Sequence, residues 1–216
     1  MKIPDRYLEG QPDIVVRLFR KWRDFMYSGA VRYSRGDSCV HGMDHYERVL
    51  FHALAVGYDI FGADENALEA LAQAAVWHDS RRQDEYLDTG HGARAAVYYT
   101  DYCREHPEIK FHEEVPYLMR YHDLDDTVGV DAIKKRFGVD APRVLKMYEV
   151  FKDADALDRW RLGSRGLDPK YLRTPSARQK VDEARELVNS TVNPCVLEDI
   201  EEEVRRNWVN DEKKSS

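Results

Sequence analysis

The amino-acid sequence predicts an all-α fold built as a helical bundle. Apolar residues recur at the spacing of three to four that places them on one face of a helix. No stretch of useful length alternates apolar and polar residues as a strand would, and no internal repeat is present. The 216 residues, 43% of them hydrophobic, are enough to fill one core. We therefore expect a single domain over residues 1–216.

Composition narrows the class of partner. A formal net charge of -7 argues against binding to a nucleic acid polymer and favours a small-molecule partner. Cys39, Cys103 and Cys195 are odd in number and far apart, which fits neither a disulfide framework nor a zinc ribbon and predicts a cytoplasmic protein. No long uncharged stretch occurs, so we expect neither a membrane span nor a signal peptide.

The first predicted helix covers residues 13–27, and Gly29 is expected to stop it from continuing. A loop then runs to Gly42, and a second helix begins near a capping Asp44. One face of this second helix starts with His45 and continues with apolar residues at helical spacing, which are Val49, Ala53, Val56 and Ile60. His45 therefore opens a buried stripe.

A third predicted helix, residues 67–77, delivers His78 and Asp79 at its end. Alanine and leucine residues lie at helical spacing behind both side chains, so both should point inward. A buried carboxylate costs several kcal/mol unless it is paired, hydrogen-bonded or bound to a metal. The sequence must therefore supply something that compensates Asp79.

The remaining elements follow from the same rules. A charged loop covers residues 80–89, and a turn is expected over residues 124–130. Further helices are predicted over residues 93–105 and 114–123, from Ala141 onward, and over 176–192 and 195–209, with a frayed tail at 211–216. We expect the C-terminal helices, residues 176–209, to pack on the rest of the bundle.

The helix that begins at Ala141 carries two aspartates near its end. Asp155 follows Val144, Tyr148 and Phe151 at spacings of four, three and four, which places it on the apolar face. Asp153 falls on a more mixed surface. We therefore predict that Asp155 is the buried member of the pair.

Four inward polar residues, His45, His78, Asp79 and Asp155, come from three separate predicted helices. Imidazole nitrogens and carboxylate oxygens together suit a divalent transition ion such as Mn²⁺, Fe²⁺, Co²⁺ or Ni²⁺, and Mg²⁺ is a further candidate. The set contains no cysteine, which argues against a structural zinc site. The sequence thus predicts a metal site with room for water.

These residues carry a resemblance to a known family. His45 with Arg48 and Val49, then His78-Asp79, then Ala154-Asp155-Ala156-Leu157, resemble the H…HD…D signature of the HD-domain superfamily of metal-dependent phosphohydrolases over roughly residues 41–160. The resemblance implies an HD-type helical bundle in which the four residues bind one metal. Family members with two metals have extra histidines between the HD pair and the last aspartate, and His91 and His122 occupy similar places.

Further side chains are candidates for the site. Asp79 would both bind metal and orient the reaction, and Arg81 and Arg82 could clamp a phosphate because a guanidinium matches its geometry. His41, four residues before His45, could face the same cavity. The alternatives are that Arg81 and Arg82 are solvated loop charges, that His91 is a loop histidine and that His122 is a hydrogen-bonded core histidine. We expect His52, His106 and His112 to be surface or partly buried residues with no chemical role.

The resemblance implies a function and leaves two others open. The first is hydrolysis of a phosphate ester, in a nucleotide or a related small phosphate, by a water that one or two metal ions activate. The second is a di-iron oxygenase of the same fold, which needs six protein ligands, His91 and His122 among them. The third is a non-catalytic sensor that binds a nucleotide.

Overall fold

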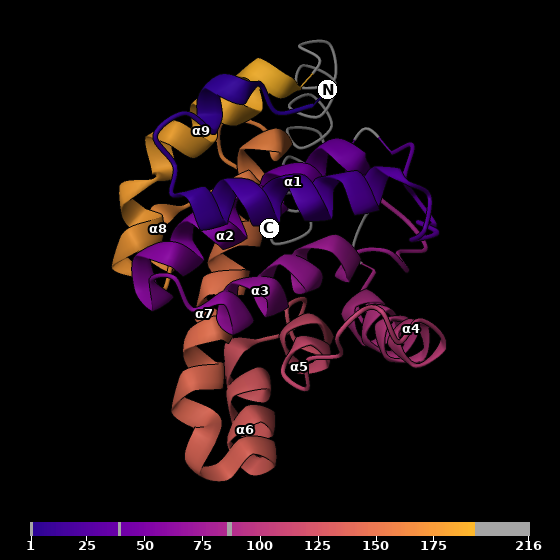
Figure 1. Cartoon of the computed structure of the whole chain (residues 1–216). Helices are drawn as coiled ribbons and strands as arrows, with labels where there is room; N and C mark the ends of the chain where they lie inside the picture. Colours follow the sequence, from indigo (N-terminus) through magenta and orange to yellow (C-terminus); the bar gives the residue numbers. More distant parts are fainter. Residues whose placement is uncertain (1, 39, 86–87, 193–216) are drawn as a thin grey trace, which may run out of the picture.

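A computed structural model describes residues 2–38, 40–85 and 88–192, and it confirms the all-α fold (Figure 1). The helices are α1 (Asp13–Tyr27), α2 (Met43–Phe61), α3 (Glu65–Trp77), α4 (His91–Glu105), α5 (Val115–Arg120), α6 (Asp126–Phe137), α7 (Ala141–Leu157), α8 (Pro175–Gln179) and α9 (Val181–Thr191), with short 3-10 turns at η1 (Asp5–Tyr7), η2 (Gly138–Asp140), η3 (Asp158–Leu162) and η4 (Pro169–Tyr171). These three ranges contain no strand. None of their helices has both the length and the apolarity that a membrane crossing needs.

Helix α2 is the centre of the bundle, and it packs against α1, α3 and α7. Every residue from 45 to 57 is buried, so this helix is covered on all sides and not only on the stripe that the sequence pattern predicts. Gly57 lets α3 approach closely, because a Cβ there would lie 2.7 Å from Leu71 Cδ1. The N-terminus of α2, with His45, is therefore enclosed by its neighbours.

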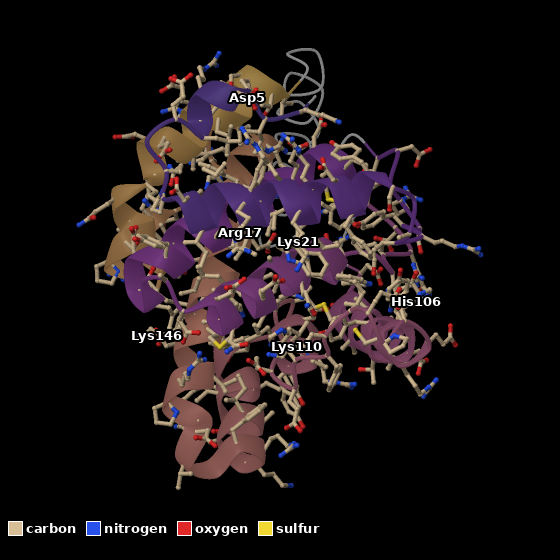
Figure 2. All side chains as sticks on the ribbon, viewed as in Figure 1. Asp5, Arg17, Lys21, His106, Lys110 and Lys146 are labelled. Carbon is tan, nitrogen blue, oxygen red and sulfur yellow. The ribbon has the colours of Figure 1, made fainter. Side chains whose placement is uncertain are left out.

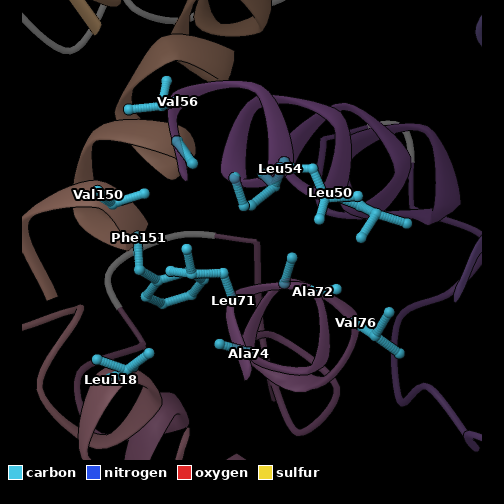
Figure 3. Close-up of a cluster of buried hydrophobic side chains, with 14 of the residues drawn as sticks. Leu50, Leu54, Val56, Leu71, Ala72, Ala74, Val76, Leu118, Val150 and Phe151 are labelled. Carbon is cyan, nitrogen blue, oxygen red and sulfur yellow. The ribbon is translucent and has the colours of Figure 1, made fainter. Parts of the chain in front are cut away.

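Apolar side chains from four helices form the core beside α2. Figure 3 shows Leu50 and Leu54 of α2 facing Leu71 of α3, with Phe151 of α7 and Leu118 of α5 beside them. All five side chains are at most 1% exposed. Burying such a side chain contributes about 1.5–3 kcal/mol, so this cluster fixes the helices that carry the polar residues of the site.

Helix α1 covers α3 on the far side of the core. The rings of Trp22 and Trp77 meet edge to face, with centroids 5.8 Å apart, and Trp22 Nε1 donates to Glu69 Oε2 at 2.6 Å. Figure 2 labels Arg17 and Lys21 of α1, which pair with Glu65 and Glu69 of α3. Because exposed ion pairs contribute little, the buried tryptophans account for most of this contact.

The structure corrects the turn predicted over residues 124–130. Helix α6 begins at Asp126, and Asp125 caps it by accepting a hydrogen bond from Thr127 N at 2.9 Å. Gly129 lies against the ring of Tyr148 in α7, where a Cβ would overlap that ring. Asp125, which suggested a turn, is therefore the helix cap, and Gly129 is a close contact between two helices. Helix α6 and the start of α7 project together from the rest of the bundle (Figure 1).

The C-terminal prediction is met in part. The predicted helix over residues 176–192 is divided into α8 and α9, with Lys180 between them, and α8 starts where Thr174 Oγ1 accepts from Ala177 N. Both helices pack on α2 and α7. The predicted helix over residues 195–209 and the tail at 211–216 lie outside the described residues.

The two aspartates of α7 also differ from the prediction. Asp153 is fully buried, whereas the Asp155 side chain is 28% exposed. The segment before α8 covers Asp153, which accepts from the backbone N–H groups of Arg173 and Thr174 at 2.9 and 2.7 Å and from Thr174 Oγ1 at 2.8 Å. Periodicity identified the mixed face of α7 but not the loop that covers it.

Asp153→Ala should destabilise the protein by about 3 kcal/mol, because it leaves several buried donors and the Arg173 charge without their acceptor. Urea unfolding at neutral pH would measure this loss. Asp131→Ala, an exposed change on α6, serves as control and should stay within about 0.5 kcal/mol of the wild type. Equal stability of the two variants would contradict the role given to Asp153.

Candidate metal centre

Six candidate ligands from five helices meet at one place in the fold. His45 lies in the first turn of α2, His78 and Asp79 directly follow α3, and Asp155 lies near the end of α7. His91 begins α4, and His122 comes just after α5. Each helix end is fixed by the core, so the convergence is a product of packing and not of a local sequence motif.

The first group comprises His45, His78, Asp79 and Asp155. The Nε2 atoms of His45 and His78 are 3.1 Å apart. His45 Nε2 lies 3.6 Å from Asp79 Oδ2 and 3.6 Å from Asp155 Oδ1. The structure thus places His45, His78 and Asp79 close enough to hold an ion. Asp155 Oδ1 lies beside the two histidines, 3.6 Å from His45 Nε2 and 4.0 Å from His78 Nε2.

The second group comprises His91, His122 and the same Asp79. The Nε2 atoms of the two histidines are 3.0 Å apart, and they lie 2.8 and 3.4 Å from Asp79 Oδ1. The carboxylate of Asp79 therefore belongs to both groups. Its Oδ1 faces His91 and His122 and lies 3.8 Å from His78 Nε2, while its Oδ2 faces His45. The structure places both histidines beside Asp79. His91 lies in the first turn of α4 and not in a loop, and His122 is buried and hydrogen-bonded to the Met119 carbonyl oxygen.

Each of the four imidazoles is oriented through its other nitrogen. The Nδ1 atoms of His78, His91 and His122 lie 2.8, 2.6 and 2.6 Å from backbone carbonyl oxygens of Ala75, Asp88 and Met119. Because a carbonyl only accepts, the proton sits on Nδ1 and the Nε2 lone pair points to the cluster. The backbone thus holds these rings in the tautomer that a metal requires.

His45 is oriented differently, by the carboxylate of Asp158. His45 Nδ1 lies 2.7 Å from Asp158 Oδ2, and Arg48 binds both oxygens of the same carboxylate. Arg48 Nη1 also donates to Thr191 Oγ1 of α9 at 3.2 Å. Burial would raise the pKa of Asp158, but Arg48 and His45 lower it well below its usual range. The sequence analysis did not assign Asp158 a role, although its position three residues after Asp155 places it one helical turn away.

The chemistry of this set fits divalent cations. Asp79 Oδ1 is a buried oxygen that makes no hydrogen bond with any described group, although imidazole nitrogens surround it. Burial lowers the pKa of His78 to about 3, so this ring is neutral near pH 7. Burial would raise the pKa of Asp155, but the adjacent histidines lower it to about 2 and the carboxylate stays ionised. Imidazole nitrogens beside ionised carboxylates can hold a metal ion.

A cavity of about 350 Å³ opens directly over the cluster. Its wall is mostly polar and is formed by His41, Asp79, Arg82, Glu85, Asp88, Thr89, His91, His122, Asp123, Leu124, Asp155, Arg159, Arg161 and Leu162. The partial exposure of Asp155 is explained by this opening. A small molecule can therefore reach the ligand atoms.

The two predicted phosphate-binding arginines separate in the structure. Arg82 is 6% exposed, lines the cavity and places Nη1 3.7 Å from Asp79 Oδ2. Arg81 turns away from the cavity, stacks on Tyr98 with 3.3 Å from its guanidinium carbon to the ring centroid, and donates to the Arg32 carbonyl oxygen. The prediction for Arg81 is corrected, because a cation–π contact and a backbone acceptor occupy its guanidinium.

His41 lies in the cavity wall, as the sequence suggested, and is held by Glu85. His41 Nδ1 is 3.0 Å from Glu85 Oε2, and Ser38 and Arg35 bind the same carboxylate. Burial, together with the charge of Arg161, lowers the pKa of His41 to about 3. A neutral imidazole therefore faces the cavity beside the cluster.

The other histidines and the cavity wall show where sequence reasoning fell short. His52 and His112 are buried, at 1% and 5% exposure, and only His106 is a surface residue. Neither buried ring reaches the cavity. Arg161 and Asp123 do reach it, and neither was a candidate site residue from the sequence. No periodic pattern marks them, since one lies in η3 and the other in a turn.

Comparisons with known proteins add no relative: no family model, no curated protein and no solved structure matches the chain.

Metal content should follow the division of the cluster into two groups. We expect about two ions per wild-type chain reloaded with Mn²⁺, about one in His78→Ala or His122→Ala, and none in Asp79→Ala, because its carboxylate serves both groups. Elemental analysis after gel filtration gives these values. An Asp79→Ala chain that keeps the wild-type content would refute the shared carboxylate.

Asp158→Asn should weaken metal binding about 10–100-fold, because an amide no longer orients His45 through a charged acceptor. Competition with a chromophoric chelator measures the affinity. Asp168→Asn, an exposed change in the loop before η4, is the control and should leave the affinity unchanged. Wild-type affinity in Asp158→Asn would contradict the orienting role.

Proposed function

We propose that this protein is a metal-dependent phosphohydrolase of the HD-domain type that uses two divalent cations. The observation that supports the proposal best is the position of Asp79, whose buried carboxylate belongs to two groups of candidate ligand atoms, one with His45 and His78 and one with His91 and His122. The order of the ligands along the chain is that of the family signature to which the sequence is similar. The proposed HD-domain type therefore rests on the order of these residues in the sequence and on their proximity in the fold.

His45, His78 and Asp155 would hold one cation, His91 and His122 the other, and Asp79 both. Such cations, when bound, supply Lewis acidity and activate water for attack on phosphorus. The chain itself orients the rings through Ala75, Asp88, Met119 and Asp158, which turns each Nε2 atom toward the cluster. These fixed contacts mean that little reorganisation accompanies binding.

The cavity supports a phosphate ester as substrate. Arg82, Arg159 and Arg161 bring positive charge to its wall, where a guanidinium can bind phosphoryl oxygens in a bidentate manner. About 350 Å³ accommodates a nucleotide or a molecule of similar size. A small phosphate monoester or diester is therefore the proposed substrate class.

Phosphate release from a panel of monoesters and diesters tests the proposal. Protein reloaded separately with Mn²⁺, Fe²⁺, Co²⁺, Ni²⁺ or Mg²⁺ should hydrolyse at least one ester, and chelation should abolish the activity. Asp79→Asn should reduce the rate at least about 1,000-fold while the protein stays folded, because the ligand common to both ions loses its charge. No hydrolysis with any metal would rule the proposal out.

A di-iron oxygenase is the second candidate, and the complete set of six ligands is the observation that favours it. Oxygen uptake by the Fe²⁺-loaded protein separates the two classes. Hydrolysis at equal rates in air and under argon supports the phosphohydrolase, whereas substrate-dependent oxygen consumption supports the oxygenase. Tight nucleotide binding with neither reaction would identify the third candidate, a sensor.

A further inference from the structure

The buried guanidinium of Arg161 is only partly satisfied within the protein. Arg161 lies in η3 at the cavity wall and is 6% exposed. Its Nε donates to the Val40 carbonyl oxygen at 2.8 Å. Its Nη1 makes no hydrogen bond with any group of the described chain, although Asp158 Oδ2 is 3.4 Å away. A buried donor without an acceptor is costly, and a bound ligand can supply the missing acceptor.

Asp158 does not compensate Arg161 fully, because other groups already use its oxygens. Arg48 binds both of them, with Nη2 3.3 Å from Oδ2, and His45 Nδ1 lies 2.7 Å from Oδ2. Two buried guanidiniums thus share one carboxylate, which leaves one positive charge in excess. Asp79 and Asp155 also attract Arg161, but they are candidate metal ligands and cations would draw on the same charges.

Arg82 adds a second guanidinium to the same cavity. It lies 3.3 Å from both ring nitrogens of His91, and both arginines act on His41, whose pKa burial and these charges lower to about 3. His41 therefore stays neutral and does not add to the positive charge. The wall around the cluster presents two buried cationic groups to whatever fills the cavity.

We propose that Arg161 and Arg82 form an anion subsite that binds the unesterified oxygens of the substrate's phosphoryl group. This inference rests on the proposed function and narrows its substrate class to phosphate monoesters. A monoester offers three unesterified oxygens and two negative charges, whereas a diester offers two oxygens and one charge. Two guanidiniums beside the cluster match the monoester, since each can donate hydrogen bonds to a charged phosphoryl oxygen.

Binding of inorganic phosphate tests the subsite without requiring turnover. Calorimetric titrations would compare phosphate with dimethyl phosphate, on both metal-free and Mn²⁺-loaded protein. In the form that binds phosphate, wild type should bind dimethyl phosphate at least tenfold more weakly. Arg161→Gln should lose about 10–100-fold in phosphate affinity, because it removes one charge-assisted hydrogen-bond donor. Equal affinities for both anions, or no phosphate binding by wild type, would overturn the proposal.

Two further variants keep the test decisive. Arg161→Lys retains the charge beside Asp158 and should fold, and it should bind phosphate at least threefold more weakly because it lacks the planar fork. Arg143→Gln removes an exposed arginine of α7 that pairs with Asp64, and it should bind phosphate as wild type does. Wild-type phosphate affinity in both Arg161 variants, or a loss in Arg143→Gln as large as theirs, would contradict the subsite.

The same experiments separate this inference from the proposed function. If the protein hydrolyses esters but the Arg161 variants bind phosphate as tightly as wild type, the anion subsite is overturned and the phosphohydrolase is not. Phosphate binding that depends on Arg161, without hydrolysis under any metal, would overturn the phosphohydrolase and leave the subsite in place.

Discussion

The buried charge of Asp79 is the constraint on which the rest of the structure depends. Its carboxylate is 3% exposed, and one of its oxygens has no hydrogen-bond partner in the described chain. Four imidazoles surround it, those of His45, His78, His91 and His122, and Arg82 lies beside it. Without cations, only these contacts offset the cost of burying the charge. The helices that carry the histidines are packed tightly enough to hold this arrangement.

The four imidazole rings of the cluster are oriented by two kinds of hydrogen-bond acceptor, backbone carbonyl oxygens and a side-chain carboxylate. Three of the rings are fixed by carbonyl oxygens of the backbone, which cannot be altered by changing a side chain. The fourth, His45, depends on the side chains of Asp158 and Arg48, and through Arg48 on Thr191 of α9. One ring of the site is therefore coupled to the C-terminal part of the described fold, whereas the others are local to their own helices.

Much of this fold and most of the ligands could be predicted from the sequence, for a physical reason. Helical periodicity shows which face is buried, so inward polar residues such as His45, His78 and Asp79 are visible as exceptions on apolar faces. Residues outside regular periodic faces give no such signal. Arg161 lies in a short 3-10 turn, and Asp123 lies between helices. Their roles come from tertiary contacts alone.

The absence of tertiary contacts from a periodic pattern also explains the predictions that were wrong. Periodicity describes one helix at a time, and it could not show that the Arg173–Thr174 backbone covers Asp153 while the face of Asp155 opens on the cavity. It could not tell a turn from the capped start of α6, because Asp, Thr and Gly suit both. Arg81 and Arg82 are neighbours in sequence, yet the direction of each side chain is set by a different partner.

The wide separation of the ligands along the chain has a consequence for how the protein folds. His45 and Asp158 are 113 positions apart, and the members of the cluster lie on α2, α4 and α7 or directly after α3 and α5. Contacts of such long range cost more loop-closure entropy than local ones, so we expect slower folding than in a bundle of local hairpins. A cation that binds this cluster recognises the finished fold and not its parts. A cation that bound the folded but not the unfolded chain would raise the free energy of unfolding by mass action.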